Sequence, residues 1–178
     1  MKTIQQFPIK IIIGLGNPGK SFDNTRHNIG FAVVNVLADM YGGTWHKKDN
    51  KEIAEVSIDN HLITLVKPLT FMNTSGKVIP ALLKQGITAK NLLVIHDELE
   101  KPFGAVGIKV GGSHKGHNGL RSIIELCGSE FIRLYCGIGR PLHKQDVSSY
   151  VLSTFSEPIE KVEAMITQAC LMIEKILV

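Results

Sequence analysis

The sequence lacks the long apolar runs of a membrane protein, and its 178 residues include only three cysteines. Runs such as Ile11–Ile13 and Leu92–Ile95 are far shorter than the ~20 apolar residues needed to cross a bilayer. The first ten residues carry glutamines and a proline where a secretion signal needs an apolar stretch. The cysteines (Cys127, Cys136 and Cys170) are odd in number and lack metal-site spacing, which indicates reduced, buried thiols. We therefore expect a cytoplasmic protein that does not associate with membranes.

Acidic residues are absent between Lys101 and Ile124. That stretch also holds Lys109, Lys115 and Arg121, whereas the whole chain has 20 basic and 16 acidic residues. Its four basic residues therefore account for the entire net charge of +4. A basic segment on an otherwise neutral chain favours an anionic partner, nucleic acid first, although a solvated loop can have the same composition.

Short strands and amphipathic helices are interspersed along the chain, a pattern typical of a single α/β domain covering residues 1–178. Apolar runs bounded by turn residues predict strands at 9–13, 53–58, 62–66, 92–95, 105–110 and 132–138. Helical spacing predicts helices at 29–40, 78–85 and 120–127, and a last helix that Ser156 caps. Because two of the strands form a hairpin around Asp59-Asn60, we expect a twisted mixed sheet surrounded by helices.

Four polar loops follow predicted strands, at residues 14–27, 67–76, 96–103 and 111–119. In open α/β sheets, ligands bind in the crevice formed by loops at the carboxyl ends of the strands. We therefore expect these four loops to converge on one cleft.

The first of these loops, GLGNPGKS, matches two phosphate-binding motifs. Its three glycines give the G-x-G-x-x-G of dinucleotide-binding proteins, and Gly14–Ser21 as a whole gives the G-x-x-x-x-G-K-S of nucleotide triphosphatases. Helical spacing begins only near Ile29, however, and Pro18 removes an amide that would otherwise bind phosphate. A dinucleotide site also needs an acidic residue about 20 positions on, at the end of a second strand. Asp39 has that distance but lies in a predicted helix, so both interpretations stay weak alternatives.

A metal hydrolase is a further alternative, because several histidines lie in the polar loops. His114 and His117, with His27 or His96 and Asp97, have side chains able to bind zinc. The His114/His117 pair lies between glycines rather than on a helix, and no H-E-x-x-H motif or cysteine cluster accompanies it. We therefore expect no metal.

Asparagine recurs in the polar loops, in the segments GLGNPG, TRHNIG, TFMNTSG and GHNG. A single asparagine is commonly a turn or cap residue. Several together suit a site that binds an ester or amide carbonyl and stabilises an oxyanion, because the side chain both donates and accepts hydrogen bonds. His27, oriented by Asp97, is a candidate general base that needs no metal. The helix that follows His27 favours its neutral form, whereas Asp97 favours the protonated form.

Six motifs identify a family that the chain resembles: GLGNPG, TRHNIGF, TFMNTSG, HDELE, GGSHKGHNGLRSII and GIGRP. In this order and spacing they are similar to bacterial-type peptidyl-tRNA hydrolase, from about Ile9 to the last predicted helix. The resemblance implies a monomeric α/β enzyme without a metal or organic cofactor. Its partner would be peptidyl-tRNA released from stalled ribosomes, bound at the acceptor stem and 3′ end. Hydrolysis of the ester between the peptide and the tRNA would recycle the tRNA.

The resemblance also implies roles for the polar residues. His27 would activate water, and Asp97 would hold it ready to accept a proton. Asn17 would sense the blocked α-amino group that separates peptidyl-tRNA from aminoacyl-tRNA. Asn73 and Asn118 would bind the 3′ end of the tRNA and the ester region.

Aromatic and basic residues are implied to contact the substrate as well. Phe71 would line the substrate channel, and Phe22 stands where the family usually has tyrosine, so that a hydroxyl group is lost there. Lys109, Lys115 and Arg121 would contact tRNA phosphates, as the charge of their segment already suggests.

Two departures from the family pattern put the tRNA contacts in doubt. Gly107 and Tyr135 stand where many members carry a basic residue. The residues able to compensate are Lys115, Arg133, Arg140 and Lys144. The alternative function is a catalytically silent RNA-binding relative on the same fold, but it gives no reason for a complete set of His27, Asp97 and asparagines.

Overall fold

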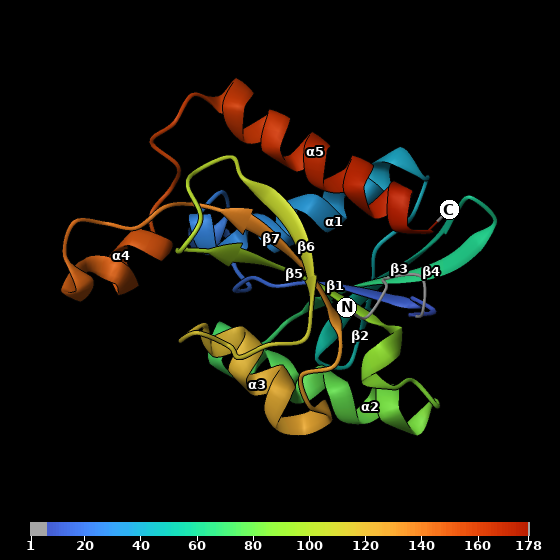
Figure 1. Ribbon diagram of the computed structural model, residues 1–178. Helices are drawn as coiled ribbons and strands as arrows, with labels where there is room; N and C mark the ends of the chain where they lie inside the picture. Colours follow the sequence, from blue (N-terminus) through green and yellow to red (C-terminus); the bar gives the residue numbers. More distant parts are fainter. Residues whose placement is uncertain (1–6, 178) are drawn as a thin grey trace.

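The computed structural model describes residues 7–177 and is organised around one seven-stranded mixed sheet (Figure 1). The strands are β1 (Ile11–Gly14), β2 (His46–Lys48), β3 (Lys51–Ile58), β4 (His61–Pro68), β5 (Leu92–Glu98), β6 (Val106–Val110) and β7 (Ile132–Gly137). Their order is β2-β3-β4-β1-β5-β7-β6. The central strands β4, β1, β5 and β7 are parallel, whereas the β2–β3, β3–β4 and β6–β7 pairs are antiparallel. Residues 1–6, part of the N-terminal stretch considered above, lie outside the described residues.

Helices cover both faces of the sheet. They are α1 (Ile29–Met40), α2 (Ile79–Lys84), α3 (Asn118–Cys127), α4 (Val147–Val151) and α5 (Ile159–Leu177). Figure 1 shows α1 and α5 on one face, α2 and α3 on the other, and the short α4 set apart at one end of the molecule. Within residues 7–177, no helix is long and apolar enough to cross a membrane.

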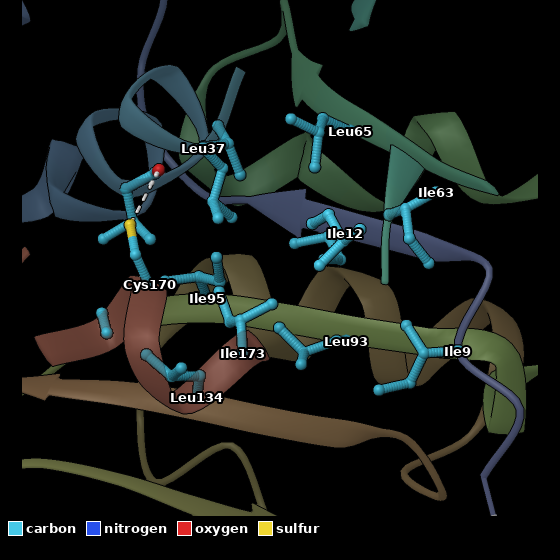
Figure 2. Packing of buried hydrophobic residues seen from close by; sticks show 14 of the residues in the cluster. Ile9, Ile12, Leu37, Ile63, Leu65, Leu93, Ile95, Leu134, Cys170 and Ile173 are labelled. Atoms are coloured by element: carbon cyan, nitrogen blue, oxygen red, sulfur yellow. Dashed lines mark hydrogen bonds between the residues drawn. The ribbon is translucent and has the colours of Figure 1, made fainter. Parts of the chain in front are cut away.

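Side-chain alternation along β1 explains why both faces are covered. Ile12 packs into the core beneath α1 and α5, whereas Ile11 and Ile13 pack into the core on the α2 and α3 side. On the first face, Ile12 and Ile95 lie close to Ile173 of α5 (Figure 2). Complete burial of one such side chain contributes ~1.5–3 kcal/mol. The two cores therefore fix β1 and β5, and with them the residues at their carboxyl ends.

The α/β fold with a mixed sheet that the sequence predicts is confirmed. The predicted hairpin is the β3–β4 pair, and Asp59 and Asn60 at its turn have φ angles of 47° and 64°. Two elements are not predicted. The three residues of β2 are all exposed and show no apolar alternation, and α4 has only five residues, too few for a helical pattern.

One sequence-based expectation about the fold is wrong. The last helix begins at Ile159, so Ser156 does not cap it; the Ser156 hydroxyl accepts a hydrogen bond from Arg26 at 3.1 Å instead. The loop after β6 joins the other three polar loops as expected, but by a longer path. Because β6 is antiparallel to β7, it ends at the edge of the sheet opposite the ends of β1, β4 and β5. Residues 111–117 return along the molecule before α3 begins.

Close packing explains the glycines of the Gly14–Ser21 loop. A Cβ atom at Gly14 would lie 2.3 Å from the carbonyl oxygen of Gly30, so only glycine lets the loop lie this close to α1. The backbone N–H groups of Leu15 and Asn17 donate to other protein atoms, at 3.0 and 2.9 Å. These amides are therefore not free to bind phosphate, and neither phosphate-binding motif describes the function of the loop.

Candidate active site

A cleft of about 630 Å³ opens where β1, β4 and β5 end. The loops after β1 and β4 contribute Asn17 and Phe71 to its walls, and the carboxyl end of β5 contributes Asp97. The start of α3 contributes Asn118, and Val151 of α4 closes another side. The structure thus brings segments from the whole length of the chain to one site.

His27 and Asp97 form a hydrogen-bonded pair in this cleft, although they are 70 residues apart in the sequence. Nδ1 of His27 lies 2.9 Å from Oδ1 and 3.0 Å from Oδ2 of Asp97. Burial lowers the pKa of His27, but the charge of Asp97 and its hydrogen bond raise it, and the net pKa lies above the ordinary value. Burial raises the pKa of Asp97, yet His27 and His117 hold it well below its usual range. The carboxylate therefore stays charged and leaves Nε2 of His27 available to a ligand.

His117 makes a second hydrogen bond to the same carboxylate. Its Nε2 lies 2.9 Å from Oδ1 of Asp97, and its Nδ1 accepts the N–H of Leu120 at 3.3 Å as the N-cap of α3. Because Nδ1 accepts, Nε2 carries the proton and donates it to Asp97. The sequence placed His117 only in the loop around the site. The sequence does contain one sign that His117 is held in place: it directly precedes a predicted helix, where an N-cap residue stands.

His96 is buried beside this group, with its ring centroid 5.4 Å from that of His117. Its Nδ1–H donates to the backbone oxygen of Asp97 at 2.7 Å. Burial, followed by the neighbouring His117, lowers the pKa of His96 to about 3, so that the ring is neutral. His96 therefore helps to fix the backbone that carries Asp97.

Asn17 is held from two sides, which leaves one of its groups free. Asn28 clamps its backbone: the Asn17 N–H donates to Oδ1 of Asn28, and Nδ2 of Asn28 donates to the Asn17 carbonyl, both at 2.9 Å. The side-chain oxygen of Asn17 accepts the N–H of Met72 at 2.7 Å. Among the described residues, the Nδ2 group of Asn17 has no protein partner, so it can donate to a ligand in the cleft.

The other residues predicted to bind substrate lie at different depths. Phe71, Asn73 and Asn118 line the cleft, and Phe71 is 60 % exposed. Phe22 is not among the lining residues. It contacts Phe71 edge to face, with ring centroids 6.1 Å apart, so its influence on the cleft passes through that ring.

The basic residues divide in the same way. Lys109 and Lys115 line the cleft, and so do Arg140 and Lys144. Arg121 is exposed on α3 outside the cleft. The structure therefore does not make Arg121 part of the cleft wall.

Arg133, considered above as a compensating tRNA contact, is fully buried, so that expectation is wrong. Its guanidinium donates to the backbone oxygens of Gly112 and, at 2.8 Å, Ser113, and so fixes the loop before α3. The two departures from the family pattern are linked to each other. Gly107 and Tyr135 are cross-strand neighbours, and a Cβ atom at Gly107 would lie 2.2 Å from the Tyr135 hydroxyl. The tyrosine therefore occupies the space that a side chain at 107 would need.

Arg26 fixes the turn that carries His27 to the segment after α4. Its Nη1 donates to the carbonyl of Thr154 at 2.8 Å, and its guanidinium lies 4.1 Å from the centroid of the Tyr150 ring. Nη2 is 3.7 Å from a carboxylate oxygen of Glu157. Arg26 is only 4 % exposed, so one buried arginine links the turn that carries His27 to α4 and the segment after it.

A cation-binding geometry is also present in the cleft. Ligand atoms of His27, Asp97 and His117 lie within 4.8 Å of one another. Both ring nitrogens already hydrogen-bond to the carboxylate, so a cation would have to displace two protons. His114, which the sequence also proposed, does not belong to this group; its Nδ1 accepts the N–H of Gly116 at 3.0 Å.

Comparisons with known proteins identify the family. The model of the peptidyl-tRNA hydrolase family matches residues 11–178. A peptidyl-tRNA hydrolase of Sulfurimonas denitrificans is 44 % identical over 173 residues, which cover 94 % of this chain and 89 % of the relative. One from Rubrobacter xylanophilus is 46 % identical over 140 residues, 79 % of this chain and 78 % of the relative. The crystal structure of peptidyl-tRNA hydrolase from Acinetobacter baumannii has a TM-score of 0.89 at 38 % identity and covers 96 % of this chain and 89 % of that one. The chain therefore belongs to the peptidyl-tRNA hydrolase family.

Proposed function

We propose that the chain hydrolyses the ester between peptide and tRNA in peptidyl-tRNA, with His27 as the general base. Family membership supports the reaction class. The observation that carries the mechanism is the 2.9 Å contact between Nδ1 of His27 and the buried carboxylate of Asp97. That contact keeps the ring proton on Nδ1, so the lone pair of Nε2 is free to accept a proton from water.

The reaction follows from this arrangement in two steps. Water attacks the carbonyl carbon of the ester while one of its protons moves to Nε2 of His27. The bond to the 3′ oxygen of the tRNA then breaks, and the imidazolium returns the proton to that oxygen. Asp97 stabilises the imidazolium between the steps and keeps the ring oriented. The products are a free peptide and a tRNA that can be charged again.

The amide side chains bind the substrate on either side of the ester. The free Nδ2 group of Asn17 donates to the carbonyl that blocks the α-amino group, which aminoacyl-tRNA lacks. Asn73 and Asn118 bind the ester region and the 3′ end, and a donor there stabilises the oxyanion that forms during attack. Phe71, supported by Phe22, provides an aromatic surface for the substrate in the channel.

Basic residues bind the phosphates of the acceptor stem and 3′ end. Lys109 and Lys115 are the principal contacts because they line the cleft, and Arg121 extends this surface along α3. Phosphate contacts of this kind position a nucleic acid without reading its sequence. The enzyme acts as a monomer, in the cytoplasm where its substrate arises.

The test is release of N-acetyl-amino acid from N-acetyl-aminoacyl-tRNA by the wild type and by His27→Ala. Loss of a general base predicts a rate about 10²–10⁴-fold lower. His61→Ala, an exposed histidine in the β3–β4 hairpin, is the matched control and keeps the wild-type rate. Full activity of His27→Ala, or loss of wild-type activity on addition of a metal chelator, contradicts the mechanism.

A further inference from the structure

We infer that a second cavity, on the far side of Asn17, binds the part of the peptide upstream of the residue esterified to tRNA. This inference rests on the proposed function. The second cavity has a volume of about 560 Å³, within the range of ~300–1,000 Å³ that is usual for ligand sites. Asn17 lies in the walls of both cavities, and no other described residue does.

The position of Asn17 indicates which part of the substrate the second cavity binds. In the proposed mechanism, Asn17 binds at the blocked α-amino group, which is the point where the upstream peptide begins. The tRNA arm of the substrate leaves the ester toward the basic residues of the cleft. The peptide arm has to leave past Asn17 in another direction. The same β4 loop borders both spaces, with Phe71 in the cleft and Leu69 in the second cavity.

The lining residues of the second cavity carry no excess of positive charge. The second cavity is lined by two basic residues, Lys20 and Lys67, and two acidic residues, Asp23 and Glu52. Its positive charge is therefore balanced, whereas the cleft is lined by four basic residues (Lys109, Lys115, Arg140 and Lys144) and three acidic ones (Asp97, Glu98 and Glu100). A balanced surface does not attract phosphates, so the second cavity is unsuited to the tRNA.

The second cavity instead offers a fixed wall of polar groups. Nζ of Lys67 lies 3.0 Å from Glu52, 3.0 Å from Oδ1 of Asn35 and 4.0 Å from the centroid of the Trp45 ring. The lysine side chain is only 12 % exposed, so these contacts hold it in place. With Oδ1 of Asn35 occupied, its Nδ2 group is the part that can donate to a peptide carbonyl. Amide side chains bind peptide backbone without regard to side-chain identity, as an enzyme acting on many peptides requires.

The experiment compares two substrates that share the tRNA, the ester residue and the acetyl block. One carries N-acetyl-alanine and the other N-acetyl-tetra-alanine. The quantity measured is kcat/KM for the long substrate divided by kcat/KM for the short one. We expect this ratio to exceed one in the wild type and to fall about tenfold, equivalent to about 1.4 kcal/mol, in Asn35→Tyr, whose ring fills the cavity. Asp39→Tyr, one turn further along α1 and exposed outside both cavities, is the control and keeps the wild-type ratio.

The ratio separates binding of the upstream peptide from general damage to the protein. A destabilised fold lowers kcat/KM for both substrates alike and leaves the ratio unchanged. A wild-type ratio of one, or an unchanged ratio in Asn35→Tyr, overturns the inference while leaving ester hydrolysis intact. Failure of the wild type to hydrolyse even the short substrate refutes the proposed function itself.

Discussion

Replacement of Asp97 by asparagine removes a charge without changing the shape of the side chain, and the structure gives a specific reason why this is damaging. In the wild type, one carboxylate oxygen, Oδ1 of Asp97, accepts hydrogen bonds from both His27 and His117, each at 2.9 Å. An asparagine oxygen at the Oδ1 position can still accept from both rings, but its NH₂ group then takes the Oδ2 position, 3.0 Å from Nδ1 of His27. His117 is locked by the Leu120 N–H on its Nδ1 and keeps its proton on Nε2. A donor at the Oδ2 position opposes a proton on Nδ1 of His27 and so favours the tautomer with the proton on Nε2.

In that tautomer His27 has no lone pair directed at water, and the general-base contribution is lost. We expect kcat to fall by about 10²–10⁴-fold. A second expectation concerns pH. Loss of the Asp97 charge removes what raises the pKa of His27, and the burial that lowers it remains. The wild-type rate therefore falls on acidification through a pKa above the ordinary value, and in Asp97→Asn the residual activity persists to lower pH.

The assay is the pH profile of kcat/KM for N-acetyl-aminoacyl-tRNA, together with the affinity for deacylated tRNA. Unchanged tRNA affinity separates lost chemistry from lost binding. An Asp97→Asn enzyme within about threefold of the wild-type rate would refute the tautomer argument, since a general base contributes far more than that. An acid limb that moved to higher pH would refute the electrostatic argument.

Two further predictions concern stability. Arg26→Met removes a buried guanidinium that binds Thr154 and lies beside Glu157. We expect the free energy of unfolding, measured in urea, to fall by about 3 kcal/mol. A change below about 1 kcal/mol would contradict the proposed link between the His27 turn and the segment after α4. The pKa of His96 is about 3 in the folded protein and 6.5 in the unfolded chain. Between these two values only the unfolded chain takes up a proton. The contribution of His96 to stability is therefore present above pH 6.5 and is lost as the pH falls. Between pH 7 and 5, the wild type should lose about 2 kcal/mol more than His96→Asn in urea unfolding, and equal losses in the two proteins would show that His96 is not buried and neutral.

The sequence predicts the fold and most of the cleft because both depend on local patterns. The apolar runs of β1 and β5 and the polar segments at their ends are visible in the sequence, and the sheet topology brings those ends together. The features that the sequence does not predict depend on contacts between segments far apart in the chain. Arg133 looks like a surface cation until the β6–β7 pairing buries it beneath the loop before α3. Ser156 has the composition of a cap, but Arg26, 130 residues away, uses its hydroxyl instead. The hydrogen bond between His117 and Asp97 is likewise not predicted. It forms only because residues 111–117 return from the opposite edge of the sheet.

The clamp from Asn28 to the backbone of Asn17 bears on how a cell protects its charged tRNA. Aminoacyl-tRNA has the same ester and the same tRNA as peptidyl-tRNA, and it must survive in the presence of this enzyme. Because Asn28 directly follows His27, a single turn of chain sets the spacing between His27 and Asn17. That spacing exists before any substrate arrives, and no closure around the ligand is needed to create it. In the proposed mechanism, the sparing of aminoacyl-tRNA is therefore a property of the resting enzyme.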